Sequence, residues 1–288
     1  MRLSSEMLAT HDSDTAQGPI GIFDSGFGGL TILREIRNVM PQYDYVYLGD
    51  NARTPYGTRS FELVYEFTRQ AVRWLFARGC RLIVLACNTA SAKALRSIQQ
   101  IDLPALDPSR RVLGVIRPTA ECIGHYTTSR HIGVLATPGT VRSRTYELEI
   151  AKLFPDVVVT SEACPMWVSL VENQEYASEG ADYFVRKNIA RLMERDSAID
   201  SVILGCTHYP FLLPKIRQYM PAGVKVLPQG EFVALSLDNY LSRHPEMQQR
   251  ISTGGTCRFF STDTPESFNE GAAWFLGDRV SAELAVLE

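Results

Sequence analysis

The sequence predicts an α/β protein built on mostly parallel sheets, and two observations lead to this prediction. Short apolar runs that end in small or polar residues alternate with longer segments in which apolar residues recur at helical spacing. Strand, helix, strand in this order is typical of parallel sheets with helices on both faces. The chain has 288 residues, of which 45% are hydrophobic and 21% charged, so it is long enough for one large domain or two smaller ones.

Eight apolar runs are predicted to be strands, because each is short and most are rich in β-branched or aromatic side chains. In chain order they lie within residues 18–26, 43–50, 80–87, 110–116, 130–137, 155–163, 201–206 and 224–230.

Two segments between these runs show the clearest helical periodicity. In residues 61–79, Val64 and Trp74 mark one apolar face, and Gly79 stands where a C-terminal cap is expected. Residues 180–196 show the same spacing of apolar side chains. Both segments are therefore predicted to be helices.

Composition and charge exclude several classes of protein. The formal net charge is −3, and basic and acidic residues are mixed along the chain, so nucleic acid is not expected as a ligand. Residues 1–18 are polar, without the apolar core of a signal peptide, and no later run is long enough to span a membrane. We therefore expect a flexible tail over residues 1–18 and a cytoplasmic protein.

The six cysteines are expected to be reduced in that compartment. None belongs to a C-x-x-C pair, so the pattern favours neither a zinc site nor a redox motif, and no metal is expected. The glycines of the segment DSGFGG lack the G-x-G-x-x-G spacing of a dinucleotide-binding loop.

Small polar residues follow several of the predicted strands. In open α/β sheets, ligands bind beyond the carboxyl ends of the strands, so these segments predict a site for a small polar ligand. The segments are Asp24–Gly26, Asp50–Gly57, Cys87–Thr89, Thr137–Thr140 and Cys206–His208.

Two of these strand ends resemble each other. LIVLACNTAS and SVILGCTHYP each run from apolar residues through a small residue to a cysteine followed by polar residues. This pattern predicts two similar α/β units that bring Cys87 and Cys206 to the two sides of a shared cleft. A lone buried cysteine more often serves as a small hydrophobe. That structural interpretation is kept for Cys80, Cys122, Cys164 and Cys257.

The chain resembles the glutamate racemase family, whose members work without a cofactor and supply D-glutamate for peptidoglycan. The segments IGIFDSGFGGLTIL, LGDNARTPYG, LACNTASA, GVLATPGTV, LVE and ILGCTHYPFL match that family's blocks in order and spacing. They extend from about residue 20 to residue 214. The CNT and GCTHYP segments are the most specific of them.

The resemblance implies roles for particular residues. Cys206 is expected to take the α-proton of L-glutamate while Cys87 delivers a proton to the opposite face, with Asp24, Glu172 and His208 assisting proton transfer. No cofactor is implied. The residues expected to hold the substrate are Asp24, Ser25, Tyr56, Gly57, Asn88, Thr89, Thr207 and His208. Helices that begin just after the two cysteines would add backbone N–H groups to the site.

The resemblance also implies an architecture of two pseudo-symmetric flavodoxin-like domains with the active site between them. We expect the first domain to comprise residues 19–115 and 228–288, and the second to comprise residues 116–227. A homodimer is expected as well. Two features depart from the family's usual sequence near the expected crossings between the domains, namely Arg117 and the segment VLPQGEF.

Three other functions remain open at this point. Aspartate is the nearest rival substrate. An enzyme that uses Cys206 as a nucleophile with His208 as its base is a second alternative, although it leaves Cys87 without a role. The third is a binding function that needs no thiol chemistry, such as the gyrase inhibition of some relatives.

Overall fold

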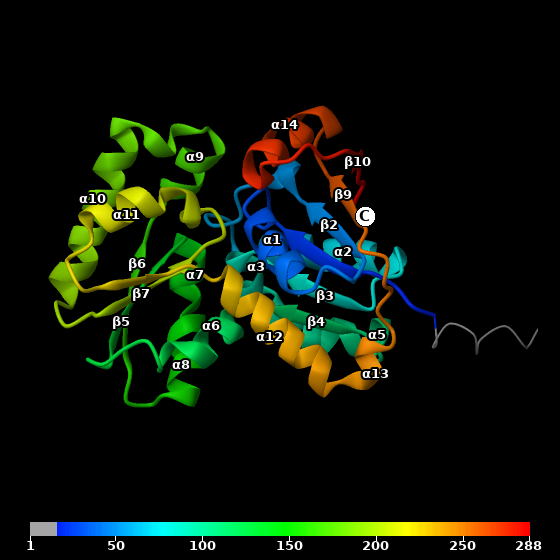
Figure 1. Cartoon of the computed structure of the whole chain (residues 1–288), viewed down its shortest axis with the longest axis horizontal. Coiled ribbons are helices and arrows are strands. Elements are labelled where there is room, and N and C mark those ends of the chain that lie inside the picture. The colour runs from blue at the N-terminus through cyan, green and yellow to red at the C-terminus, as the bar shows by residue number, and fades with distance from the viewer. Residues whose placement is uncertain (1–15) are drawn as a thin grey trace, which may run out of the picture.

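The computed structural model describes residues 16–288, which form two parallel sheets lying side by side as two lobes (Figure 1). The larger sheet has six strands in the order β10-β9-β2-β1-β3-β4, and all neighbours are parallel. Its strands are β1 (Ile20–Asp24), β2 (Tyr45–Gly49), β3 (Leu82–Leu85), β4 (Arg111–Gly114), β9 (Cys257–Ser261) and β10 (Ala282–Leu284).

The smaller sheet has four strands in the order β6-β5-β7-β8, again all parallel. Its strands are β5 (His131–Ala136), β6 (Val158–Ala163), β7 (Ser201–Gly205) and β8 (Lys225–Leu227). The order of β6-β5-β7-β8 repeats that of β2-β1-β3-β4, which is the flavodoxin-like order. The predicted fold class is therefore confirmed, and so are all eight predicted strands. The sequence patterns did not predict β9 and β10.

Helices flank both sheets. Those associated with β1 to β4 are α1 (Leu30–Val39), α2 (Phe61–Ala77), α3 (Asn88–Lys93), α4 (Leu95–Ser97) and α5 (Leu103–Leu106), with a π-helical turn at Ile98–Asp102. Those between β4 and β8 are α6 (Ile116–Ile123), α7 (Pro138–Ser143), α8 (Thr145–Leu153), α9 (Trp167–Glu172), α10 (Glu179–Arg195) and α11 (Leu213–Tyr219). The chain ends with α12 (Gly230–Arg243), α13 (Pro245–Gln248) and α14 (Pro265–Leu276).

The two helices with the clearest periodicity are confirmed as α2 and α10. Their starts are capped by Ser60 and Ser178, whose hydroxyl oxygens accept backbone N–H bonds from the first turn. Gly79 has φ of +86°, the left-handed conformation that ends a helix and that glycine adopts without a steric penalty. The predicted cap therefore stands just beyond the end of α2.

The central strands are buried on both faces, because helices cover both sides of each sheet. Every residue of β1, β2, β3 and β7 is buried. This burial explains why the strands appear in the sequence as continuous apolar runs without alternation.

Each sheet has a topological switch point, which is the place where the strand order reverses. The strands on its two sides are added toward opposite edges of the sheet. In the larger sheet it lies between β1 and β3, and in the smaller sheet between β5 and β7. The helices on the two sides of a switch point leave a crevice at the carboxyl ends of these strands. Asp24 ends β1 and Cys87 follows β3, whereas Thr137 follows β5 and Cys206 follows β7.

The chain crosses from the larger sheet to the smaller after β4 and returns after β8. On its return, α12 packs against α1 of the larger lobe. We propose domain boundaries near residues 115 and 227, in keeping with this change of sheet. Among residues 16–288, no helix combines the length and the apolar character needed to cross a membrane.

The predicted N-terminal tail falls mostly on residues 1–15, which lie outside the described residues. Gln17 and Gly18 already contact the body of the protein. The Gln17 side chain donates a hydrogen bond to the Gln249 carbonyl at 3.0 Å, and Gly18 forms a β-bridge with Ile251.

Tyr47 links the core to the turn that follows β1, because its buried hydroxyl donates a 2.7 Å hydrogen bond to the Gly26 carbonyl. We predict that Tyr47→Phe lowers the free energy of unfolding by about 1–3 kcal/mol, since it leaves a buried carbonyl unpaired. Urea unfolding would measure this loss. Tyr45→Phe is a matched control, because Tyr45 lies on the same strand and bonds the Met40 carbonyl, also at 2.7 Å. It should cost a similar amount of stability, and a Tyr47→Phe protein as stable as the wild type would contradict this role of the Tyr47 hydroxyl.

Candidate active site

A cavity of about 20 Å³ lies where the switch points of the two sheets meet. It brings together most of the residues that the sequence predicted for the site. The residues that line it are Ser25, Pro55, Tyr56, Gly57, Cys87, Asn88, Thr89, Thr137, Val168, Cys206, Thr207 and His208. Both cysteines face this one cavity, one from each sheet.

Cys87 is the N-terminal cap residue of α3. Its Sγ accepts a hydrogen bond from the backbone N–H of Ala90 at 3.5 Å and lies 3.4 Å from Ser25 Oγ. Burial raises the pKa of the Cys87 thiol to about 12, and the charge of Asp24 adds to this effect. Cys87 is therefore held as a thiol, with a proton to give.

Cys206 has a different set of partners. Its Sγ lies 3.7 Å from Nδ1 of His208, and Nε2 of the same ring lies 2.9 Å from Glu172 Oε1. Burial lowers the pKa of His208, but its hydrogen bonds to Cys206 and Glu172 outweigh burial and raise the pKa well above the ordinary value. The ring can therefore hold a proton between the thiol and the carboxylate.

Asp24 and Glu172 do not line the cavity but lie directly behind residues that do. Asp24 accepts a 3.4 Å hydrogen bond from the Thr207 hydroxyl and a 3.0 Å bond from the Gly26 N–H. Burial raises the pKa of Asp24 to about 6, although the nearby positive charge of His208 opposes the shift. Asp24 thus acts near both thiols. It bonds to Thr207, the neighbour of Cys206, and its charge raises the pKa of Cys87.

Among the residues predicted to hold the substrate, Asn88 and Thr89 bond to protein groups of both lobes. Thr89 Oγ1 lies 2.9 Å from Thr137 Oγ1 across the cleft. The Asn88 amide donates to Gln229 Oε1 and accepts from the Tyr146 hydroxyl, both at 2.8 Å.

Tyr56 and Gly57 come from the loop after β2. The Tyr56 hydroxyl donates a short hydrogen bond to Asp50, and Asp50 also pairs with Arg53 at 2.8 Å. The backbone carbonyl of Gly57 accepts a 2.8 Å hydrogen bond from the N–H of Gly139 in the other lobe. This loop therefore belongs to the wall of the cavity and to the contact between the lobes.

Pro55, Thr137 and Val168 line the cavity although no individual role was predicted for them. Pro55 and Thr137 belong to the strand-end segments that the sequence predicted for the site. Thr137 follows a strand that was recognised, so its position was the available signal. Val168 gave no signal, because an apolar residue on α9 does not differ from a core residue in sequence.

A helix begins directly after Cys87, but none begins directly after Cys206. The α3 helix begins at Asn88, whereas a 3₁₀ turn, Tyr209–Leu212, precedes α11 on the other side. Pro210 and Pro214 lie at the starts of these elements, where the missing N–H of proline is tolerated. His208 directly precedes this turn, and its Nδ1 lies 3.7 Å from Cys206 Sγ.

The two lobes make close contact around the cavity. The Thr31 hydroxyl donates a 3.1 Å hydrogen bond to the Thr207 carbonyl, and the stacked rings of Phe211 and Trp274 meet with centroids 4.5 Å apart. A cavity of about 20 Å³ holds about one water molecule. An amino acid can therefore enter only if the lobes separate.

Most of the chain matches a known protein family. The family model for Asp/Glu/Hydantoin racemase matches residues 30–233, which include both cysteines. The chain belongs to this family. Glutamate racemase from Caulobacter sp. is 41% identical over 284 residues, covering 92% of this chain and 99% of that protein. Glutamate racemase from Dinoroseobacter shibae is 38% identical over 271 residues, covering 91% and 96%.

Solved structures show the same fold. An isoform of glutamate racemase from Bacillus anthracis is 34% identical with a TM-score of 0.85, covering 94% of this chain and 98% of that chain. Glutamate racemase from Francisella tularensis, solved in complex with D-glutamate, is 30% identical with a TM-score of 0.82, covering 96% and 98%. An aspartate racemase from Picrophilus torridus is 18% identical with a TM-score of 0.51, a likeness that concerns the fold alone.

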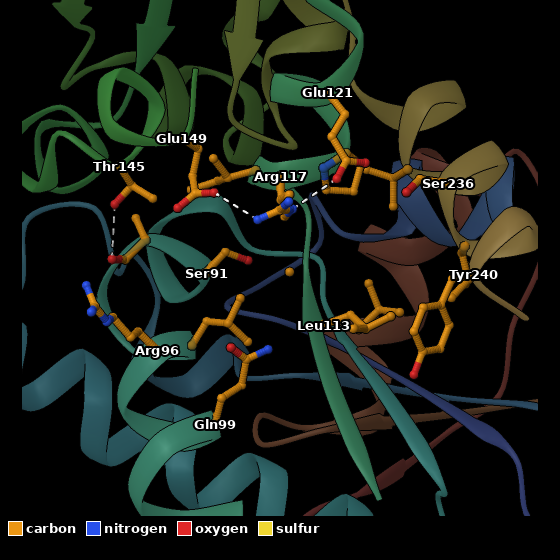
Figure 2. A pocket seen from close by; sticks show the side chains of 18 of the residues that line it. Ser91, Arg96, Gln99, Leu113, Arg117, Glu121, Thr145, Glu149, Ser236 and Tyr240 are labelled. Atoms are coloured by element: carbon orange, nitrogen blue, oxygen red, sulfur yellow. Dashed lines mark hydrogen bonds and ion pairs between the residues drawn. The ribbon is translucent and has the colours of Figure 1, made fainter. Parts of the chain in front are cut away.

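A larger cavity, of about 830 Å³, lies near the crossings between the lobes and is lined by parts of β4, α4, α6, α8 and α12. Figure 2 shows Arg117, one of the two departures from the family's usual sequence, reaching from α6 between two carboxylates. Arg117 Nε lies 2.9 Å from Glu121, and Arg117 NH1 lies 3.6 Å from Glu149 on α8. This cavity contains neither cysteine, so it is not the candidate active site.

Close packing of Gly28 against the second lobe provides a test of the closed arrangement. A methyl group at this position would lie 2.3 Å from Thr207 Oγ1 and 2.5 Å from His208 Nδ1. We predict that Gly28→Ala lowers kcat/KM by on the order of 100-fold, because it displaces reacting groups by a fraction of an ångström or more. Gly180→Ala, where the nearest atom lies at 3.4 Å, is the control and should leave kcat/KM unchanged. Steady-state kinetics would decide, and equal rates for both variants would contradict the closed arrangement.

Asp24 should lower stability at neutral pH, because its pKa of about 6 in the folded protein exceeds the ordinary value of 3.8. As the pH rises from about 4 to about 6, the unfolded chain releases this proton before the folded one does. We predict that Asp24→Asn raises the free energy of unfolding by roughly 2–3 kcal/mol at pH 7, and that the gain disappears below about pH 4. The same variant should lose activity.

Urea unfolding at pH 7 and pH 4 measures this effect. Asp44→Asn is the control of opposite sign, because hydrogen bonds from Thr256 lower the pKa of Asp44. Asp44→Asn should lose stability at pH 7. An Asp24→Asn protein that is less stable than the wild type at pH 7 would show that burial does not dominate at this carboxyl.

Proposed function

We propose that this protein is a glutamate racemase that interconverts L-glutamate and D-glutamate without a cofactor and supplies D-glutamate for peptidoglycan synthesis. The observation that carries the proposal is the meeting of Cys87 and Cys206, one from each sheet, at a single buried cavity. Inverting a stereocentre requires a base on one face of the α-carbon and an acid on the other. The family and the relatives named above support glutamate as the substrate.

The different partners of the two thiols support a direction for the first proton transfer. Cys206, next to the protonated ring of His208, is the base toward L-glutamate, and its sulfur takes the α-proton. The electron pair of the broken C–H bond stays on the substrate as a carbanion. Cys87 gives its proton to the opposite face, which produces D-glutamate and leaves Cys87 as a thiolate. The reverse reaction exchanges the two roles.

A thiolate alone cannot drive the first step. If the α-proton lies on the order of ten pKa units above a thiol, the mismatch is roughly 14 kcal/mol. The free energy that offsets this mismatch has to come from fixed hydrogen-bond donors that stabilise the carbanion in a closed site. The buried polar groups at Ser25, Thr89 and Thr207 and the backbone N–H groups at the start of α3 are suited to that role.

The roles of the individual residues are part of this proposal. Cys87 and Cys206 exchange protons with the substrate, and Asp24, Glu172 and His208 assist them. The substrate is held by Asp24 and His208 together with Ser25, Tyr56, Gly57, Asn88, Thr89 and Thr207.

We also propose a cytoplasmic homodimer, supported by the resemblance alone. Light scattering on the purified protein tests the dimer.

Proton exchange with solvent tests the two-thiol mechanism directly. L-Glutamate incubated with the reduced protein in deuterated water, without added cofactor, is expected to gain deuterium at the α-carbon while its optical rotation disappears. In Cys87→Ala, Cys206 can still remove the α-proton of L-glutamate. We therefore predict α-deuteration of L-glutamate without inversion, and no exchange into D-glutamate. Cys206→Ala should show the opposite pattern, as mass spectrometry and chiral chromatography would reveal.

Two outcomes contradict the proposal. If the wild type exchanges no α-proton of glutamate, this substrate is wrong, and aspartate becomes the next substrate to test. If Cys87→Ala racemises glutamate at the wild-type rate, the second thiol has no catalytic role.

A second candidate function is nucleophilic catalysis, and one observation favours it. Cys206, His208 and Glu172 form a thiol, imidazole and carboxylate chain with spacings of 3.7 Å and 2.9 Å. Such an enzyme forms a covalent intermediate on Cys206, whereas a racemase does not. Intact-protein mass spectrometry after a rapid acid quench distinguishes these two mechanisms. Only nucleophilic catalysis adds the mass of an acyl group to the protein.

A further inference from the structure

Gln229, within the second departure from the family's usual sequence, has no assigned role but lies at the centre of a buried polar cluster. Its side chain contacts Asn88, Tyr146 and Thr119, and all four residues are buried. Gln229 occupies the cap position of α12, yet its side chain makes no capping hydrogen bond there. All hydrogen bonds of the Gln229 side-chain amide go to residues outside α12.

Three of these residues form a closed ring of hydrogen bonds. The Asn88 amide donates to Gln229 Oε1 at 2.8 Å, the Gln229 amide donates to the Tyr146 hydroxyl, and that hydroxyl donates to Asn88 Oδ1 at 2.8 Å. Each member donates to the next, so each of the three side chains both donates and accepts a hydrogen bond within the ring. A closed buried network of this kind holds its side chains in one arrangement.

The surroundings of Gln229 determine the direction of the ring. Gln229 Nε2 lies 3.4 Å from the Val115 carbonyl and 2.9 Å from Thr119 Oγ1. A carbonyl can only accept hydrogen bonds, so the amide nitrogen rather than the oxygen has to face it. The oxygen of Gln229 then faces Asn88, and Asn88 is held with its own nitrogen toward Gln229.

This orientation leaves one donor of Asn88 for a ligand. An amide nitrogen carries two protons, and Asn88 gives one of them to Gln229. The second meets no acceptor within residues 16–288, while Asn88 itself lines the cavity that holds both thiols. A carboxylate in that cavity is the ligand that such a donor suits.

The ring also joins the two lobes. Asn88 begins α3 beside the larger sheet, and Tyr146 lies on α8 in the core of the smaller lobe. Gln229 stands at the second crossing, and its neighbours Thr119 and Val115 stand at the first. The three-membered ring is therefore complete only when the lobes are closed.

We propose that Gln229 is a positioning residue for substrate binding, which orients the Asn88 amide toward the substrate carboxylate when the lobes close. This inference rests on the proposed racemase function. Gln229 affects substrate binding through Asn88 and contacts neither thiol.

Gln229→Met tests the proposal, because methionine has a similar shape but neither donor nor acceptor strength. The KM for L-glutamate is expected to rise about tenfold, with kcat changed less than about threefold, since a binding contact is lost. The pH profile of kcat/KM should keep its shape, because Gln229 contacts neither the thiols nor His208. An unchanged KM in a folded Gln229→Met protein overturns the proposal.

A double-mutant cycle shows whether the effect passes through Asn88. If it does, Asn88→Ala combined with Gln229→Met has the KM of Asn88→Ala within about twofold. If the two effects multiply instead, Gln229 acts independently, and the proposal is wrong.

Thr119→Val is the matched control. It removes a hydroxyl that contacts Gln229 but leaves the three-membered ring complete. KM should stay within about twofold of the wild type, because the buried Thr119 hydroxyl is not a member of the ring and makes no hydrogen bond to Asn88. A rise equal to that of Gln229→Met would assign the effect to packing at the crossings and overturn the proposal.

If Gln229→Met does not fold, Tyr146→Phe tests the same ring, since it removes only the hydroxyl that Asn88 and Gln229 share. The same tenfold rise in KM is expected. Calorimetric titration with L-glutamate repeats each comparison without turnover. An active wild type with unaltered variants contradicts this inference alone, whereas a wild type that neither racemises nor binds glutamate contradicts the proposed function and this inference together.

Discussion

The carboxyl ends of two parallel sheets have to face each other across one closed cavity, and the remaining features of the site depend on this constraint. In each sheet the switch point places polar side chains at a crevice, and the two crevices meet. Cys87 follows a strand in one sheet and Cys206 a strand in the other. A single sheet offers one such edge, so the meeting of two sheets is what lets two thiols share one cavity.

The surroundings distinguish the two thiols although their chemistry is the same. Cys87 has a serine hydroxyl and a backbone N–H nearby, and burial keeps its proton in place. Cys206 faces an imidazole ring that is itself paired with Glu172. The difference between the two thiols therefore comes from the groups that surround them and not from the cysteines themselves. Asp24 acts on both sides, and its burial in the folded protein is a cost to stability that the site retains.

Closure of the lobes connects binding with chemistry. Hydrogen bonds such as Thr31 to Thr207 and the ring of Asn88, Gln229 and Tyr146 span the boundary between the lobes. These contacts involve Asn88 and Thr207, which also line the cavity. The substrate therefore has to enter an open form, and its binding energy contributes to assembling the closed site.

The sequence by itself determined the fold class, the first eight strands and the position of each predicted site residue along the chain, because apolar runs and strand-end motifs are local signals. It did not reveal β9, which pairs with β2 more than two hundred positions away, or β10, which pairs only with β9. Nor did it reveal Val168, Tyr146 or Gln229 as neighbours of the site. Only the tertiary structure decided which partner each thiol has and that Asn88 bonds to Gln229. Distances between side chains depend on how the two sheets pack, and no local pattern in the sequence encodes that packing.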